Sequence, residues 1–248
     1  MHDKYRWSGW QALQTVARHT LLFRREKLGH GVETFCDTAS RSAGLIRHAA
    51  EPYGPSAILI HGSPGTALEW NRLMAALPRN WNILAPYRKG YGAFARDGGE
   101  TCLAGHAAAL IPCMDAEGEG TSQKKVVLGH SYGAPVAARL AADYPERCSG
   151  LILMAGSLDP YLEEVFAIQR WAAHPMAQAL LPRALRHANK ELMALRGELD
   201  ALAARLERIS CPVHIIHAED DSLVPYANTA YIRHKCSHVP VHMHILKN

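Results

Sequence analysis

A short serine-centred sequence near the middle of the chain, GHSYG at 129–133, has the residue types needed for nucleophilic catalysis. A short apolar run at 124–128 precedes it and a helix-forming run at 134–143 follows it, so we expect Ser131 to lie on a sharp strand-to-helix turn. The start of that helix would add positive potential and free N–H groups behind the hydroxyl. The pattern favours a serine that attacks a carbonyl carbon, although an ordinary glycine-rich turn could have the same sequence.

Acyl transfer also needs two hydrogen-bond donors aimed at the oxygen that becomes negatively charged. The backbone N–H of Tyr132 can supply one of them. A second turn, HGSPG at 61–65, ends another apolar run, and the N–H of its Ser63 is the candidate for the other donor. A plain Pro-Gly turn is the alternative interpretation of this segment.

A carboxylate that orients a histidine base should follow the nucleophile in the chain. Three acidic residues, Glu219, Asp220 and Asp221, come shortly after the apolar run 212–217. Asp221 is favoured because it alone stands four residues before Pro225. Any of the three could instead be a solvated loop charge.

Short apolar runs that alternate with helical segments would position these residues. Strands are predicted at 32–38, 44–48, 56–60, 81–85, 124–128, 150–155, 212–217 and 239–246. Helices are predicted at 67–77, 101–114, 134–143 and 226–234, with an amphipathic N-terminal helix at about 10–25. This order predicts the α/β class, with a mostly parallel central sheet flanked by helices on both faces.

Residues 160–208 interrupt the alternation, because they have helical periodicity and no strand run. An insertion after the strand at 150–155 would lie over the carboxyl ends of the strands, where open α/β sheets bind ligands. We therefore predict a core of residues 1–159 and 209–248 and a helical cap of residues 160–208. The apolar side chains expected mostly to pack this cap onto the core are Trp171, Met176, Leu180, Leu181, Leu185, Leu192, Met193 and Leu195.

Together these segments resemble the α/β-hydrolase fold superfamily, from about residue 32 onward. The matching stretches are HGSPG at 61–65, GHSYG at 129–133, YPERCSGLILMAG at 144–156 and DDSLVP at 220–225. The resemblance implies Ser131 as nucleophile, Asp221 as acid, and the N–H groups of Ser63 and Tyr132 as the oxyanion hole. The residues that would support the turn and the loop are His61, Gly62, Gly129, His130 and Gly133. Serine at the turn argues against the haloalkane dehalogenase and epoxide hydrolase branches, which use aspartate there.

Two features depart from the pattern of this superfamily. Tyr87 stands where relatives usually have aspartate, in a structural loop for which we expect little functional consequence. More seriously, the base of the family is a histidine just after the last strand, and no histidine follows the strand at 239–246. We expect the sequence to be a fragment that ends shortly before that histidine. An intact noncatalytic relative and the recruitment of His244 are the alternatives.

The predicted activity is hydrolysis of a carboxylic ester, thioester or related acyl bond through an acyl-enzyme intermediate, on a small hydrophobic substrate and without a cofactor. A serine without its base is a weak nucleophile at neutral pH, so the 248-residue form is expected to be nearly inactive. The alternatives are a cofactor-free perhydrolase, a carbon–carbon hydrolase on the same fold, and a noncatalytic ligand-binding relative.

Composition and charge argue against several other classes. The 248 residues have a formal net charge of +4 with scattered basic residues, which does not predict nucleic-acid binding. No segment has the length and apolarity of a membrane span, and the charged first 30 residues do not resemble a secretory signal. The six cysteines have no C-x-x-C spacing, so we expect reduced thiols in a cytoplasmic protein.

Two pairs of residues could suggest other sites. His242 and His244 have no third ligand nearby in the sequence, so no metal site is predicted. Glu163 and Glu164 are expected on a solvated helix face and not as a catalytic carboxylate pair.

Overall fold

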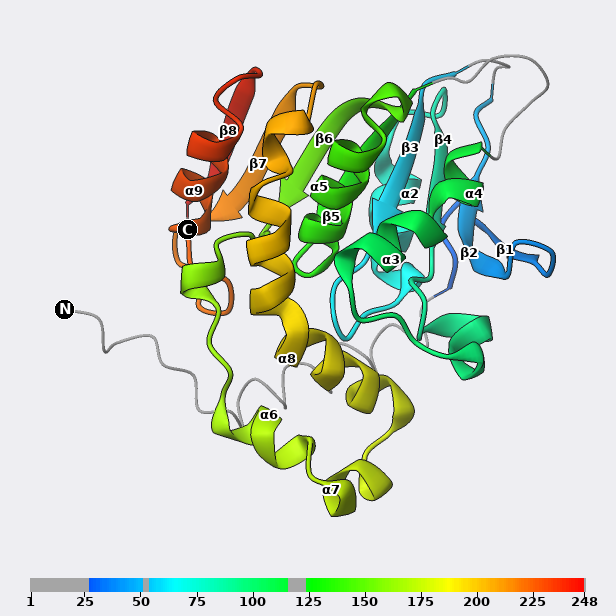
Figure 1. Ribbon diagram of the computed structural model, residues 1–248. Coiled ribbons are helices and arrows are strands. Elements are labelled where there is room, and N and C mark those ends of the chain that lie inside the picture. Colours follow the sequence, from blue (N-terminus) through cyan, green and yellow to red (C-terminus); the bar gives the residue numbers. More distant parts are fainter. Residues whose placement is uncertain (1–26, 51–53, 116–123, 248) are drawn as a thin grey trace.

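The computed structural model describes residues 27–50, 54–115 and 124–247 (Figure 1). The helix predicted at about 10–25 lies outside these residues. In the described part of the chain, an eight-stranded sheet has the order β1-β2-β4-β3-β5-β6-β7-β8. The strands are β1 (Glu33–Asp37), β2 (Ser42–Arg47), β3 (Ser56–Ile60), β4 (Asn82–Pro86), β5 (Lys125–His130), β6 (Cys148–Met154), β7 (Val213–Ala218) and β8 (Val241–Leu246).

The sheet is mostly parallel, which confirms the predicted class. Strand β2 pairs antiparallel with both β1 and β4, whereas the pairs from β4 through β3, β5, β6 and β7 to β8 are all parallel. Parallel neighbours need crossover connections, and these carry the helices. The strands occupy the predicted segments with shifts of at most a few residues.

Helices cover both faces of the sheet, as the apolar strands require. The α-helices are α2 (Asn71–Ala76), α3 (Leu103–Ala109), α4 (Ile111–Asp115), α5 (Gly133–Asp143), α6 (Ala167–Ala172), α7 (Pro175–Leu180), α8 (Arg183–Ala203) and α9 (Asn228–Lys235). The 3₁₀-helices are η2 (Ala67–Trp70), η3 (Gly92–Asp97), η4 (Pro145–Arg147), η5 (Pro160–Leu162) and η6 (Leu206–Arg208). The helix predicted at 101–114 is divided into α3 and α4, because Pro112 has no N–H to continue the hydrogen-bond ladder.

Strand β3 shows how one strand serves two cores. Alternate side chains point to opposite faces of a sheet. Ile58 and Ile60 accordingly belong to the cluster with α3, α5 and the C-terminal half of α8. Ala57 and Leu59 belong to the cluster with η2 and α2 on the other face. Figure 1 shows α3, α5 and α8 in front of the sheet.

Helix α5, which directly follows the GHSYG sequence, is the most deeply buried helix of the described part. All of its residues from Gly133 to Ala142 are buried. Its small alanine side chains allow close packing against β3, β5 and β6, because they keep the helix backbone near the sheet. This helix therefore fixes the position of the residues at its N-terminus.

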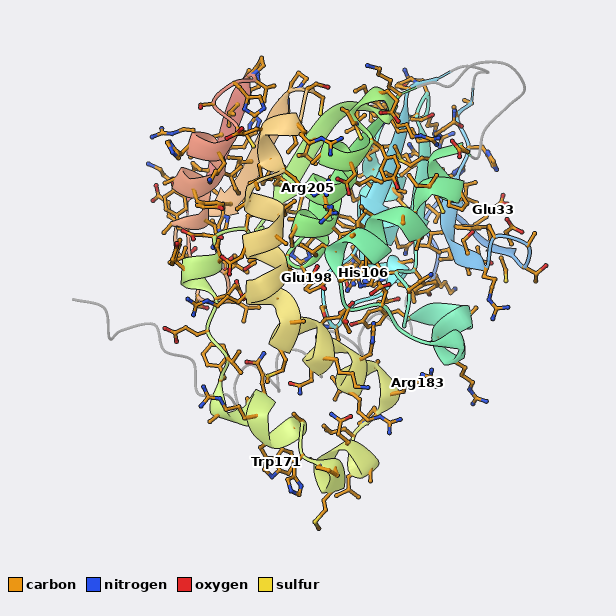
Figure 2. The ribbon with its side chains drawn as sticks, in the orientation of Figure 1. Glu33, His106, Trp171, Arg183, Glu198 and Arg205 are labelled. Atoms are coloured by element: carbon orange, nitrogen blue, oxygen red, sulfur yellow. The ribbon has the colours of Figure 1, made fainter. Side chains whose placement is uncertain are left out.

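The helices inserted between β6 and β7 differ from their prediction in one respect. Leu195 of α8 is fully buried, and Leu181, Leu185 and Leu192 are half-buried, but the other four predicted packing residues are exposed, and these are Trp171, Met176, Leu180 and Met193. Helices α6 and α7 extend past the end of the sheet, and Trp171 points away from it (Figure 2). Among the described helices, none combines the length and the apolarity needed to cross a membrane.

Candidate functional site

Ser131 lies on the turn between β5 and α5, as the sequence predicts. Its φ of +52° is in the left-handed region, which a non-glycine residue rarely adopts. Two hydrogen bonds hold this conformation: the Ser131 N–H donates to the Met154 carbonyl at 3.0 Å, and the Ala134 N–H donates to the Ser131 carbonyl at 2.9 Å. The backbone is therefore bent so that the serine side chain projects from the turn.

The two glycines on either side of this serine are required by packing. A Cβ on Gly129 would lie 2.1 Å from the Gly133 carbonyl oxygen, and a Cβ on Gly133 would lie 2.2 Å from the Ile60 carbonyl oxygen. Both distances are far below van der Waals contact. The G-x-S-x-G pattern is thus explained by the close approach of α5 to the ends of β3 and β5.

The loop after β3 lies directly against Ser131. A Cβ on Gly62 would be 3.2 Å from the Ser131 Cβ, which places the next residue, Ser63, beside the turn. Within the described residues, the amide N–H groups of Ser63 and Tyr132 have no hydrogen-bond acceptor. Backbone N–H groups without an acceptor are rare in folded proteins, and a pair of them is suited to binding a negatively charged oxygen.

His61 supports the loop after β3. Its Nε2 accepts a hydrogen bond from the Arg88 N–H at 3.0 Å, so its Nδ1 carries the proton and donates to the Gly62 carbonyl at 2.9 Å. Burial and the neighbouring charge of Arg88 lower the pKa of this imidazole to about 4. His61 is therefore neutral near pH 7, and both of its nitrogens are occupied by backbone groups.

Glu191, a buried residue of α8 that the sequence analysis does not single out, contacts the same loop. Its carboxylate accepts hydrogen bonds from the Ser63 hydroxyl at 2.5 Å and the Tyr91 hydroxyl at 2.7 Å, and it pairs with the buried Arg88 guanidinium. Burial opposes its ionisation, but Arg88 and hydrogen bonds from His106 and His187 hold its pKa well below the usual range. The inserted helix is thereby bonded to the proposed oxyanion loop.

A sequence signal for Glu191 does exist. It occupies the same helical stripe as Leu195, Leu199 and Leu202, all of which are buried. A carboxylate on the apolar stripe of a helix must find a partner in the interior. The partner, Arg88, is the arginine that follows Tyr87 in the loop after β4.

His106, His187 and Glu191 form a compact group whose potential ligand atoms lie within 4.8 Å of one another. Arg88 Nη1 is 3.1 Å from His106 Nε2 and also pairs with Glu191. The guanidinium thus supplies the positive charge that a metal ion would bring, and it would oppose a second cation at this place. The group is an ion-pair network rather than a fitting metal site.

Asp221 lies in the loop after β7, near the edge of the sheet formed by β7 and β8. Its Oδ1 accepts the N–H groups of Leu223 and Val224, both at 2.9 Å, and its Oδ2 is 3.6 Å from His217 Nε2. Its rival Glu219 is exposed and lies 3.8 Å from the Lys247 ammonium. Asp221 is thus more firmly positioned than Glu219, and within the described residues no hydrogen bond to its Oδ2 is found.

His217, which the sequence analysis also leaves out, lies beside this acid. Its Nε2 donates to the Val224 carbonyl at 2.9 Å. Among the buried polar atoms of the described residues, its Nδ1 is one of the few without a hydrogen-bond partner. The His217 ring is fully buried, and its hydrogen bond to the Val224 carbonyl connects β7 to the loop that carries Asp221.

The remaining candidate histidines have other partners. His130 Nδ1 is 3.7 Å from a Glu69 carboxylate oxygen, and His238 Nε2 contacts the Ile209 carbonyl at 2.9 Å. His242 and His244 stack against the ring of His214 on the exposed face of β7 and β8. In the part of the chain that the structure describes, no histidine is hydrogen-bonded to the Ser131 hydroxyl.

The expectation for Glu163 is wrong. It lies in the non-helical segment between η5 and α6, not on a helix, and its carboxylate contacts the Ser157 hydroxyl. Burial, together with the nearby charge of Asp159, raises its pKa to about 7. Its neighbour Glu164 is exposed, as expected, but it lies in the same non-helical segment and not on a helix face.

Comparison with known proteins gives the same fold. A family model described as the alpha/beta hydrolase fold matches residues 55–204, which is more than half of the chain. A protein of Escherichia coli O7:K1 (strain IAI39 / ExPEC), named "Putative carbamate hydrolase RutD", is 30% identical over 213 residues, covering 71% of this chain and 78% of the relative.

Solved structures resemble the whole described fold at low sequence identity. A bacterial membrane phospholipase A has a TM-score of 0.65 at 17% identity and is matched over 95% of this chain and 82% of that chain. A structure reported as "a putative epoxide hydrolase from Pseudomonas aeruginosa" has a TM-score of 0.65 at 20% identity, over 89% of this chain and 90% of that chain. Because this family model matches more than half of the chain, including β3 to β6 and the inserted helices α6 to α8, the chain belongs to the α/β-hydrolase fold family.

Proposed function

We propose that the protein is a serine hydrolase that cleaves acyl bonds through an acyl-enzyme. The Ser131 hydroxyl attacks the carbonyl carbon, and the amides of Ser63 and Tyr132 stabilise the oxyanion. The leaving group departs with a proton, and water then hydrolyses the acyl-serine. The observation that supports this most is the strained turn at Ser131, beside which two N–H groups have no acceptor among the described residues.

The base of this proposal is a histidine oriented by Asp221. Strands β7 and β8 are adjacent and parallel, so the segments that follow them leave the sheet at the same edge. A histidine that followed β8 would enter beside the Asp221 loop, whose Oδ2 is available to an imidazole N–H. Among the described residues no histidine is hydrogen-bonded to the Ser131 hydroxyl, so the 248-residue form is expected to react slowly.

The proposed substrates are carboxylic esters, thioesters or related acyl compounds with a hydrophobic acyl group. A carbamate also carries a carbonyl carbon that a serine can attack, so the name of the relative RutD is consistent with this range. We assign residues 160–208 as a cap and residues 1–159 and 209–248 as the core. Support for the cap comes from α8, whose Glu191 lies against the loop after β3.

A fluorophosphonate probe tests the nucleophile directly, because it reacts covalently with activated serines. The 248-residue chain and a chain with an added histidine-bearing C-terminal extension are compared, each with S131A and with S237A, a control at an exposed serine. We expect labelling of the extended protein and its S237A variant, weak labelling of the shorter form, and none in S131A. Labelling that survives in S131A, or that is absent from both lengths, would contradict the proposal, and the second result would favour a ligand-binding protein.

Esters of p-nitrophenol with acyl chains of increasing length then test the substrate class. We expect release of p-nitrophenol that depends on Ser131 and on acyl length. Cleavage that is unchanged in S131A would show that another group performs the reaction.

A further inference from the structure

A small cavity lies between α7, α8 and the 90–99 segment. It has a volume of about 190 Å³ and is lined by Gly90, Ala95, Gly99, Gln178, Arg183, Arg186, His187 and Lys190. This is below the ~300 Å³ at which pockets for drug-sized molecules begin, so it suits a single small group rather than an acyl chain. The cavity joins α7 and α8 to the segment around η3.

Positive charge dominates the described lining of this cavity. Arg183, Arg186 and Lys190 are spaced three and four residues apart on α8, so they share one face of the helix. Like charges at this spacing destabilise a helix unless an opposite charge compensates them. Among the described lining residues there is no carboxylate, and the ion pairs of the described residues do not include these three cations.

One of the three cations, Arg186, has a neutral partner, and so does the neighbouring His187 ring. An Arg186 guanidinium N–H donates to the Gln178 carbonyl of α7 at 3.0 Å, and His187 Nε2 is 3.0 Å from the Lys89 carbonyl. Helix α8 has no side-chain N-cap, so the N–H groups of its first turn add to the positive potential. Figure 2 shows Arg183 at the start of α8, on the side of η3.

Two glycines of the 90–99 segment fit closely around His187. A Cβ on Gly90 or on Gly99 would lie 2.1 or 2.2 Å from the His187 ring. On its other side, the His187 ring packs against the Tyr91 ring, with ring centroids 5.1 Å apart. His187 Nε2 also lies 3.4 Å from a carboxylate oxygen of Glu191. The side chains of Tyr91, His187 and Glu191 therefore separate the cavity from the Ser63 hydroxyl.

A concave site with several cations and little compensating charge concentrates anions from solution. Arginine guanidinium groups bind phosphate and carboxylate oxygens through paired N–H donors. We propose that this cavity is an anion site that binds the phosphate or carboxylate group of a small molecule. The site is distinct from the proposed acyl chemistry at Ser131, and its existence does not depend on that function.

The bound anion would link the inserted helices to the core. Arg183 and Lys190 come from α8 and Arg186 is anchored to α7, whereas Gly90 and Gly99 belong to the segment after β4. Occupation would neutralise the repulsion within α8 and hold this helix against the 90–99 segment. Since Glu191 of the same helix contacts Ser63, the ligand would also stabilise the loop after β3.

The test is titration of the purified chain with inorganic phosphate and, separately, with succinate, followed by calorimetry and by thermal unfolding. We expect saturable binding, a melting temperature that rises with ligand concentration, and affinity that falls as salt increases. The R183Q/K190Q double variant should bind at least about tenfold more weakly, because it loses two charge-assisted contacts. R196Q, which changes an exposed arginine of the same helix outside the cavity, should bind like the wild type.

Thermal unfolding without ligand shows whether the double variant is folded, and we expect it to melt at or above the wild-type temperature because repulsion is relieved. Absence of saturable binding of both anions, or equal binding by R183Q/K190Q and the wild type, would overturn the proposal. Fluorophosphonate labelling of Ser131 is measured in the same samples, so failure of the anion site and failure of the proposed hydrolase are separate results.

The source of the anion is distinguished with two p-nitrophenyl esters of similar length in the extended chain, one with a terminal carboxylate and one neutral. If the anion belongs to the substrate, R183Q/K190Q should raise KM for the charged ester and leave KM for the neutral ester unchanged. If the anion is a free ligand, phosphate should bind without changing the preference between the esters. Either result agrees with the anion site.

Discussion

At the scale of single residues, the backbone of Ser131 stores strain that its neighbours maintain. A left-handed conformation costs an L-residue with a Cβ about 1–2 kcal/mol. The hydrogen bonds to Met154 and Ala134 keep Ser131 in this conformation. Strain of this kind persists only where surrounding structure imposes it, and it is concentrated at functional sites.

This strain predicts an unusual order of stabilities. We expect S131G to be about 1 kcal/mol more stable than S131A, because glycine adopts positive φ without a steric penalty whereas alanine keeps the Cβ. Urea unfolding followed by tryptophan fluorescence measures the difference. At the exposed Ser237 the order should reverse or vanish, since its φ is not positive. Equal stability of S131G and S131A would show that the turn is not strained.

The buried pair of Glu191 and Arg88 gives the second prediction. Replacing Glu191 by glutamine leaves Arg88 buried without its counter-charge, which typically costs about 3–5 kcal/mol. We therefore expect E191Q to be destabilised by about 3 kcal/mol in urea unfolding and, since Ser63 loses an anionic acceptor, to label more slowly with fluorophosphonate.

Two further variants separate the ion pair from general damage to α8. D200N changes an exposed carboxylate of the same helix and should cost less than about 0.5 kcal/mol. The R88M/E191L double variant removes both charges and should be less destabilised than E191L alone, because no unpaired charge remains. A double variant as unstable as the sum of the single ones would contradict an ion-pair role.

At the scale of elements, the junction of β3, β5 and α5 decides where Ser131 lies. Gly133 is the first residue of α5 and lies against the carbonyl of Ile60, so the helix can start there only without a side chain. Gly197 is the control position, because it lies in α8 and a Cβ added there would meet no atom within 4 Å. Comparing the two glycines therefore distinguishes the effect of close packing from the effect of helix propensity.

Opposite effects of alanine are expected at these two glycines. G133A should destabilise the protein by about 2 kcal/mol or more, because a methyl group must displace the backbone of β3. G197A should stabilise it by up to about 1 kcal/mol, because alanine has the higher helix propensity. Urea midpoints of the two variants check this, and a neutral G133A would mean that the junction is not tightly packed.

Much of this architecture could be predicted because local patterns and tertiary structure agree. The apolar run at 56–60 is β3 in the structure, and the GHSYG glycines match a real close approach. The predictions for single side chains failed where contacts with residues distant in the sequence determine burial and hydrogen bonding. The environment of Glu163 and the exposure of Trp171 depend on how the inserted helices extend past the sheet, which periodicity does not contain. Glu191 needed its partner Arg88, which lies 103 residues away.

At the scale of the whole molecule, the buried His61 and the half-buried Glu163 have opposite effects on the free energy of unfolding between pH 4.5 and 6.5. The pKa of His61 is lowered from 6.5 to about 4, chiefly by burial and then by the charge of Arg88. The pKa of Glu163 is raised from 4.5 to about 7, chiefly by burial and then by the charge of Asp159. Each of these differences in pKa between the folded and the unfolded chain corresponds to on the order of 3 kcal/mol.

The signs of the two contributions differ. As the pH falls from 6.5 to 4, the unfolded chain protonates His61 while the folded protein does not, so this group contributes stability above pH 6.5 that is lost in acid. Glu163 is protonated in the folded protein up to about pH 7 but only up to about pH 4.5 in the unfolded chain. Its contribution is therefore present below pH 4.5 and is lost as the pH rises towards 7.

These opposed contributions predict that variants of the two groups change the pH dependence in opposite directions. In E163Q, the free energy of unfolding should rise more steeply with pH between 4.5 and 6.5 than in the wild type, because only the His61 contribution remains. In H61Q the dependence should become flatter or turn negative, whatever the absolute stability of the variant. Urea unfolding at closely spaced pH values measures the slopes, and H234Q, at an exposed position of α9, serves as the control. Parallel curves for all four proteins would show that neither buried group has a shifted pKa, and the neutral His61 assigned to the loop beside Ser131 would then be wrong.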